Sequence, residues 1–88
     1  MEKILESYVY PAIFSHEEDG ISIRFLDLPG CYSCADSAEE ALYMAKDVLK
    51  LHLYGLEEEN QDIPVPSDIS KIELHKNEYI ALTEDFRR

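Results

Sequence analysis

The sequence predicts an α+β domain with the element order β-β-β-α-β, in which a three-stranded antiparallel meander is joined by a fourth strand and one long helix packs on one face. Apolar residues alternate with polar ones in the first third of the chain, recur at helical spacing over residues 41–56, and alternate again near the C-terminus. The length of 88 residues allows one small domain, and 45% hydrophobic with 10% aromatic residues favours a packed core.

The first two strands are expected to form a hairpin. Residues 7–15 are rich in aromatic and β-branched side chains, and Pro11, which lacks an N–H, predicts an unpaired side or a bulge there. The segment Glu17-Glu18-Asp19-Gly20 ends in Asp-Gly, a strong hairpin signal. In residues 21–26 the apolar side chains alternate, which places Ile21, Ile23 and Phe25 on one face.

Pro29-Gly30 ends the second strand, and a short third strand is expected over roughly 31–35. The helix that follows begins with a capping box, in which the Ser37 hydroxyl accepts from the Glu40 amide and the Glu40 carboxylate reaches back. Gly55 leaves two possible ends for it, at Gly55 itself or at Glu58. Its apolar stripe consists of Ala41, Leu42, Ala45, Val48, Leu49, His52, Leu53 and Leu56.

Residues 57–68 are expected to be a loop, because they are acidic and contain Pro64-Val65-Pro66. Residues 78–83 predict the last strand, and the alternation of Ile72 and Leu74 favours a further short strand. One helix covers only one face of such a sheet. The other face carries two of the apolar side chains of the first strand, so we expect a protein partner or a homo-oligomer, either a dimer or a tetramer. Those side chains come from the set Tyr8, Val9, Tyr10, Ile13 and Phe14.

Nineteen acidic against eight basic residues give a formal net charge of −11. Such a chain repels phosphate groups, which argues against direct binding of nucleic acid or of an anionic membrane. The bases are also unevenly placed, since none occurs in 4–23, 25–45 or 51–70. The N-terminus lacks a signal-peptide pattern, no apolar run reaches membrane-spanning length, and two cysteines are too few for a disulfide scaffold. We therefore expect a cytoplasmic protein with reduced thiols.

Two motifs invite a chemical interpretation. Cys31-Tyr32-Ser33-Cys34 is a C-x-x-C, but on a strand its two thiols point to opposite faces, so we expect a small buried apolar residue at each position. A two-metal hydrolase needs three or four converging acids. The local roles of three acids argue against it, since Asp19 suits the turn, Asp36 the helix entry and Asp27 the Pro29-Gly30 turn. We expect no enzyme, no metal and no cofactor. The four acids that could in principle serve such a site are Asp19, Asp27, Asp36 and Asp85.

Several motifs in succession resemble the N-terminal domain of the HicB antitoxin family. They are an acidic Asp-Gly hairpin, a strand ending in Phe25-Leu26-Asp27-Leu28-Pro29-Gly30-Cys31, a helix start Ala35-Asp36-Ser37-Ala38-Glu39-Glu40-Ala41, and the loop Ile63-Pro64-Val65-Pro66-Ser67. The resemblance covers roughly residues 7–85. Leu26 departs from the proline, and Ala35 from the glycine, that the family commonly has. The residues that carry the family motif, all with structural roles, are Gly20, Pro29, Gly30, Cys31, Ser37, Glu40, Ala41, Pro64 and Pro66.

The resemblance implies a partial RNase H-like fold and an antitoxin of a type II toxin–antitoxin system. Its partner would be a basic HicA-like toxin, an mRNA-cleaving ribonuclease whose active site the antitoxin occludes. Family members usually continue into a DNA-binding domain. The whole chain, 1–88, corresponds to the single N-terminal domain, so we expect that DNA-binding part to be absent.

On this interpretation, partner-binding residues are expected among Glu17, Glu18, Asp19, Asp27 and Tyr32, because acidic side chains and an exposed aromatic suit a basic protein. An alternative is a stand-alone oligomeric regulatory or structural protein of the same fold that has no toxin partner.

Overall fold

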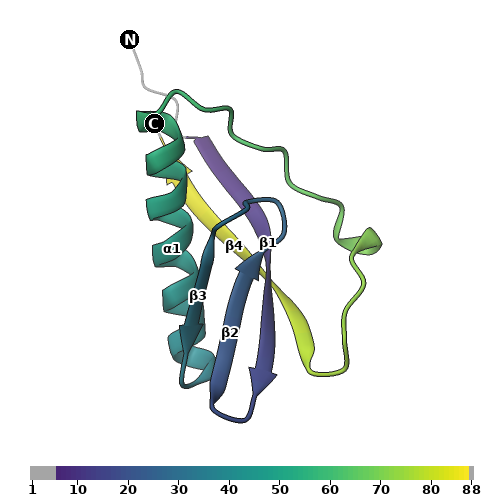
Figure 1. The fold of residues 1–88 in the computed structure, drawn as a ribbon. Coiled ribbons are helices and arrows are strands. Elements are labelled where there is room, and N and C mark those ends of the chain that lie inside the picture. The colour runs from purple at the N-terminus through teal and green to yellow at the C-terminus, as the bar shows by residue number, and fades with distance from the viewer. Residues whose placement is uncertain (1–5, 88) are drawn as a thin grey trace.

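Four strands and one long helix form the domain in the computed structural model, which describes residues 6–87, and the side chains of 7–86 (Figure 1). The strands β1 (Glu6–Glu17), β2 (Gly20–Phe25), β3 (Tyr32–Ala35) and β4 (Glu78–Arg87) form one antiparallel sheet in the order β3-β2-β1-β4. The helix α1 (Ala38–Glu58) stands between β3 and β4 in sequence. This arrangement confirms the predicted order β-β-β-α-β.

The central strand β1 pairs with β2 on one side and with β4 on the other. The β1–β2 ladder ends at Ala12↔Phe25, so Pro11 lies one residue beyond it and pairs with Leu82 of β4. The predicted unpaired side at Pro11 is thereby confirmed. The strand β4 is longer than the predicted 78–83, because it pairs with β1 along its whole length.

The capping box at the start of α1 is confirmed with a shift of one residue. The Ser37 hydroxyl accepts from the Glu40 amide at 3.1 Å, as predicted. The Glu40 carboxylate accepts at 2.7 Å from the amide of Asp36, one residue before the cap. The helix passes through Gly55 and ends at Glu58, the longer of the two predicted alternatives.

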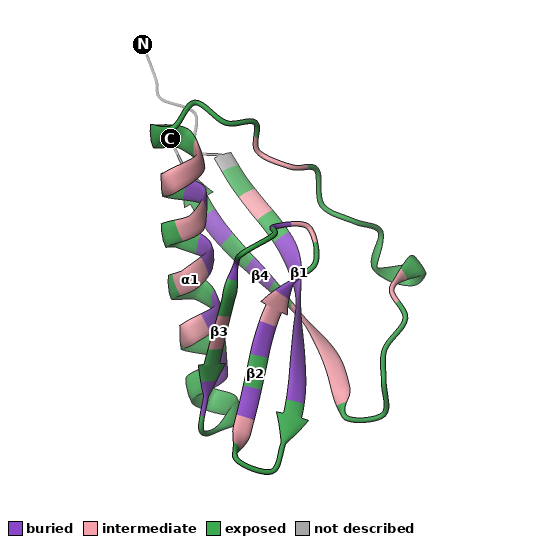
Figure 2. Ribbon diagram, in the orientation of Figure 1, coloured by how far each residue is buried: buried purple, intermediate pink, exposed green. Residues whose placement is uncertain are grey.

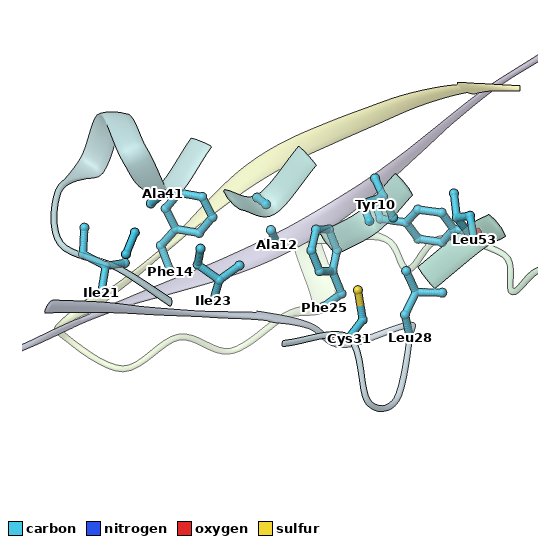
Figure 3. Packing of buried hydrophobic residues seen from close by; sticks show 13 residues of the cluster. Tyr10, Ala12, Phe14, Ile21, Ile23, Phe25, Leu28, Cys31, Ala41 and Leu53 are labelled. Atoms are coloured by element: carbon cyan, nitrogen blue, oxygen red, sulfur yellow. The ribbon is translucent and has the colours of Figure 1, made fainter. Parts of the chain in front are cut away.

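The core lies between α1 and one face of the sheet (Figures 2 and 3). Apolar residues of β1 and β2 meet the helix there, and their faces are those that the alternation predicts. The prediction that Leu42 belongs to the apolar stripe of the helix is wrong, because its side chain is exposed at the edge of the buried face. The helix buries Ala41, Ala45, Leu49 and Leu53, and the sheet and the turn after β2 bury Tyr10, Ala12, Phe14, Ile21, Ile23, Phe25, Leu28, Cys31 and Ala35.

Val9 and Ile13 are the apolar residues of β1 on the face away from the helix, in agreement with the sequence pattern. Ile13 is nevertheless 0% exposed. Beside it, Arg24 of β2 reaches over β1 to Glu78 of β4, with 2.7 Å between Nη1 and Oε2. This part of the open face thus carries a polar bridge of the chain itself beside Ile13.

The expected short strand at Ile72 and Leu74 is wrong. The long loop between α1 and β4 contains a 3-10 turn, Ile69–Lys71, and no strand within its described residues. The Asp68 side chain accepts from the Ser70 amide at 3.0 Å and caps the start of this turn. The alternating residues Ile72 and Leu74 follow the turn as irregular backbone. Among residues 6–87, no helix has the length and apolar character needed to cross a membrane.

Candidate functional site

The acidic end of the molecule forms where the β1–β2 hairpin meets the start of α1 (Figure 1). Glu18 and Asp19 form the hairpin turn between the paired residues Glu17 and Gly20. Gly20 has φ of +145°, and a Cβ atom there would lie 2.7 Å from the carbonyl oxygen of Ala35. Only glycine allows this approach, which brings the acidic turn beside the first turn of the helix.

A cleft of about 260 Å³ opens at this end, and four carboxylates line it. Glu40 is engaged by the Asp36 amide. Within the part of the chain that the structure describes, no hydrogen bond or ion pair holds the carboxylates of Glu17, Asp19 and Asp36. Acids beside the N-terminus of a helix are stabilised by its dipole. This cleft therefore presents negative charge that the chain itself does not neutralise. The lining carboxylates are those of Glu17, Asp19, Asp36 and Glu40.

The structure does not bring all predicted partner-binding residues together. Glu17, Glu18 and Asp19 lie at the acidic end, whereas Asp27 follows β2 at the opposite end of the sheet. Six residues of strand, roughly 20 Å, separate Asp19 from Asp27. Tyr32 opens β3 opposite Arg24, with its side chain largely exposed. A single flat contact therefore does not join the turn acids to Asp27.

Asp27 has a structural partner that the sequence did not indicate. Its carboxylate accepts from the Ser67 amide at 3.0 Å and from the Ser67 hydroxyl, so it holds the long loop rather than the Pro29-Gly30 turn that we predicted for it. The same loop is held again where the buried Tyr10 donates from its hydroxyl to the Pro64 carbonyl at 2.5 Å. Burial, together with the negative charge of Asp27, raises the pKa of Tyr10.

The remaining motif residues occupy structural positions. Gly30 has φ of +87° in the turn that leads to Cys31. Cys31 is buried in the core, and burial raises the pKa of its thiol to about 11. Cys34 lies exposed on β3, so the prediction of a buried residue at both positions holds for Cys31 and is wrong for Cys34. Among residues 6–87, no group of three or more His, Cys, Asp or Glu side chains is placed to hold a metal ion.

Sequence reasoning missed Asp36 and Glu40 as parts of an acidic surface, because both had a sufficient local role at the helix start. A signal was present, since six acids occur in two short runs, 17–19 and 36–40, with no base between 25 and 45. An antiparallel meander returns the chain to the end where the first hairpin turns. The two runs meet for that reason.

Comparison with known proteins points in one direction. Residues 10–84 match the family described as "HicB_like antitoxin of bacterial toxin-antitoxin system". The chain is 40% identical over 58 residues to Antitoxin HicB 2 of Photorhabdus laumondii, covering 66% of this chain and 42% of that protein. It is 30% identical over 71 residues to an uncharacterized 14.9 kDa protein of Haemophilus phage HP1, covering 81% of this chain and 53% of that protein. The chain thus spans about half the length of the curated relatives it matches.

Two solved structures are similar in fold. A chain of a toxin–antitoxin complex from Streptococcus pneumoniae superposes with a TM-score of 0.80 at 21% identity, covering 90% of this chain and 69% of that one. A chain of the HicA3 and HicB3 toxin–antitoxin complex gives a TM-score of 0.70 at 20% identity, covering 86% of this chain and 95% of that one. These similarities confirm the α+β arrangement.

Proposed function

Because this chain belongs to the HicB-like antitoxin family of bacterial toxin–antitoxin systems, we propose that it is an antitoxin that binds and occludes a basic, HicA-like, mRNA-cleaving ribonuclease. The observation that carries this proposal is the acidic cleft between the β1–β2 hairpin and the start of α1. Three of its carboxylates, those of Glu17, Asp19 and Asp36, lack partners within the described chain, and complementary charge is what a basic protein needs for fast and specific association.

The contact we propose is centred on Glu17, Asp19 and Asp36, with Glu18 at its rim. A lysine or arginine entering the cleft would meet the carboxylates of Glu17, Asp19 and Asp36. Tyr32 of β3 offers an exposed aromatic side chain on the open face of the sheet, opposite Arg24. The contact we propose does not include Asp27, which lies at the opposite end of the sheet and whose carboxylate accepts from Ser67.

The proposed action is binding rather than catalysis. Of the four acids considered for a metal site, Asp19 and Asp36 line the acidic cleft, and Asp27 lies at the other end of the sheet. Asp85 sits on β4 opposite Tyr8, on the helix-facing side. The family resemblance supports a cytoplasmic protein, and the net charge of −11 argues against direct contact with nucleic acid.

The proposal is tested with the protein encoded by the adjacent reading frame. The two proteins are mixed, a complex is sought by size-exclusion chromatography, and cleavage of RNA by the partner is measured with and without the chain. We expect a complex in which cleavage is suppressed. A partner that remains separate and continues to cleave RNA contradicts the proposal.

The surface is tested by neutralising three carboxylates with E17Q, D19N and D36N. We expect the association rate at low salt to fall about tenfold or more, because electrostatic steering is lost. The matched control carries E58Q, E59Q and D62N. These substitutions also remove three negative charges, but at the C-terminal end of α1 and just beyond it. Equal losses in both variants would show that net charge, and not this cleft, governs binding.

A further inference from the structure

The outer edge of β4 is a long strand edge without the usual protection. The strand pairs with β1 through all ten of its residues in one unbroken register, and it contains no proline, glycine or lysine. Its middle, residues 79–83, carries no charge. The strand at the opposite edge, β3, is only four residues long. Natural sheets protect their edges with short strands, bulges, prolines or lysines, and β4 has none of these.

One hydrogen bond at the start of the strand fixes which backbone groups point outward. The His16 amide donates at 2.9 Å to the Asn77 carbonyl, so the N–H of His16 points toward the β4 side. Successive N–H groups of a strand point to opposite sides, so the odd-numbered residues of β4 pair with β1 and the even-numbered ones point away. The outward N–H and C=O groups of Ile80, Leu82 and Glu84 have no backbone partner within residues 6–87.

The space beside this edge is open to another chain. Leu82 is 59% exposed on the face away from α1, and a hollow of about 440 Å³ lies between α1 and the C-terminal part of β4. A strand paired with β4 places alternate side chains on the two faces of the sheet. Because the charges around the hollow nearly balance, it favours a segment without strong charge. These charges are Asp47, Glu84 and Asp85 against Lys46 and Lys50.

The proposed toxin contact needs more surface than the acidic cleft provides. Specific complexes bury about 800 Å² on each partner. A cleft of about 260 Å³ admits only a few side chains. The edge of β4 begins beside this cleft, because Glu78 pairs with Ser15, two residues before Glu17, which lines it. Adjacent strands lie only about 4.8 Å apart, so the edge continues the proposed contact surface.

We propose that the toxin adds one extended, uncharged segment to the outer edge of β4, as a fifth strand of the sheet. The inference rests on the proposed antitoxin function and names the backbone groups that hold the partner. The free N–H and C=O groups of Ile80, Leu82 and Glu84 pair with that segment, and the exposed Leu82 side chain packs against it. The acidic cleft then governs the association rate, and the strand pairing governs the lifetime of the complex.

Hydrogen exchange measured by NMR on the parent chain tests the pairing, with the protein of the adjacent reading frame as the partner. In the free chain, the amides of Ile80, Leu82 and Glu84 are expected to exchange rapidly, whereas the amides that face β1 exchange slowly. In the complex, we expect these three outward amides to slow about tenfold or more, so that the alternation along β4 disappears.

The outcomes separate this inference from the function on which it rests. A complex in which RNA cleavage is suppressed while the outward amides exchange as in the free chain overturns the strand pairing and leaves the antitoxin function intact. A partner that stays separate and cleaves RNA overturns both. Slowing of the same amides in the chain alone at rising concentration assigns the edge to a second copy, and this too overturns the proposal.

Two variants at one position separate the backbone from the side chain. L82P removes the outward N–H, and proline is tolerated where the N–H of an edge strand faces solvent. L82A removes the same side-chain contacts but keeps the N–H. We expect L82P to raise the dissociation rate of the complex about tenfold or more beyond L82A, at low and at high salt alike.

Circular dichroism and urea denaturation check that both variants are folded. Equal dissociation rates for L82P and L82A overturn the proposal, and so does a difference that vanishes at high salt. The exchange experiment uses the parent chain and therefore decides the proposal by itself if L82P does not fold.

Discussion

Arg24 and Glu78 form an ion pair across the central strand of the sheet, with 2.7 Å between the guanidinium Nη1 and the carboxylate Oε2. Glu78 is only 5% exposed, and it also accepts from the Ser15 hydroxyl at 2.9 Å and from the His75 amide at 2.9 Å. One carboxylate thus joins β2, β1, β4 and the turn before β4. The three strands and the turn are thereby tied together on the face away from α1, next to the buried Ile13.

Glu78 makes the stability of the fold sensitive to acid. The hydrogen bond from the His75 amide, with those from Arg24 and Ser15, lowers the pKa of Glu78 to about 2. The unfolded chain has a glutamate pKa of about 4.3. The stabilisation is therefore fully present above about pH 5 and is lost as the pH falls toward about 2.

We expect E78Q to lower the denaturation midpoint at neutral pH and to flatten the decline of stability below about pH 5. Urea denaturation followed by circular dichroism at several pH values measures both effects. The exposed E73Q serves as the control and should keep the slope of the parent chain. A slope in E78Q as steep as in the parent would contradict the assignment.

Gly20 is expected to be irreplaceable even by alanine. The substitution G20A places a methyl group 2.7 Å from the backbone oxygen of Ala35 at a φ of +145°, and both effects are unfavourable. We expect a loss of about 2–3 kcal/mol in the free energy of unfolding. In contrast, G55A adds a Cβ that meets nothing within 4 Å in α1 and should stabilise by up to about 1 kcal/mol. Equal effects of the two substitutions in urea denaturation would refute this explanation.

Local signals in the sequence predicted the local parts of this fold. The Asp19-Gly20 turn and the cap at Ser37 depend on neighbouring residues, and both are where the pattern indicates. The extension of β4 to Arg87 depends on the length of β1, and that pairing spans most of the chain. Alternation alone does not distinguish the irregular segment at Ile72 and Leu74 from a strand. The backbone there follows a 3-10 turn that is capped by Asp68.

In the candidate site, too, the local sequence predicted some residues, whereas others depend on tertiary contacts. The turn acids Glu17 and Asp19 were predicted, because a hairpin turn is exposed wherever it occurs. Asp36 joins them through the meander, a tertiary relation that the spacing does not state. The contact of Asp27 with Ser67, forty positions away, leaves no trace in the sequence near either residue, so the sequence alone does not predict it.

The role of Asp27 as an anchor of the long loop is separable from partner binding. Removing its carboxylate with D27A is expected to free the Ser67 amide, so that hydrogen exchange at Ser67 accelerates while exchange in β1 and α1 remains slow. Exchange measured by NMR distinguishes the loop from the sheet. The control S70A, which loses a hydroxyl bonded to Asp68 in the same loop, should leave Ser67 protected. Unchanged exchange at Ser67 in D27A would contradict the anchor.

The two cysteines are expected to differ sharply toward a thiol reagent. The thiol of Cys34 is exposed on β3, whereas Cys31 is fully buried and burial raises its pKa to about 11. Because the thiolate is the reactive form, Cys31 is protected both by access and by its protonation. A colorimetric disulfide reagent should therefore titrate one thiol per folded chain rapidly and the second only after denaturant is added. C34S should remove the rapid phase alone, and C31S should leave it intact. Rapid reaction of both thiols in the folded chain would show that the core opens at the turn before β3 on the timescale of the assay.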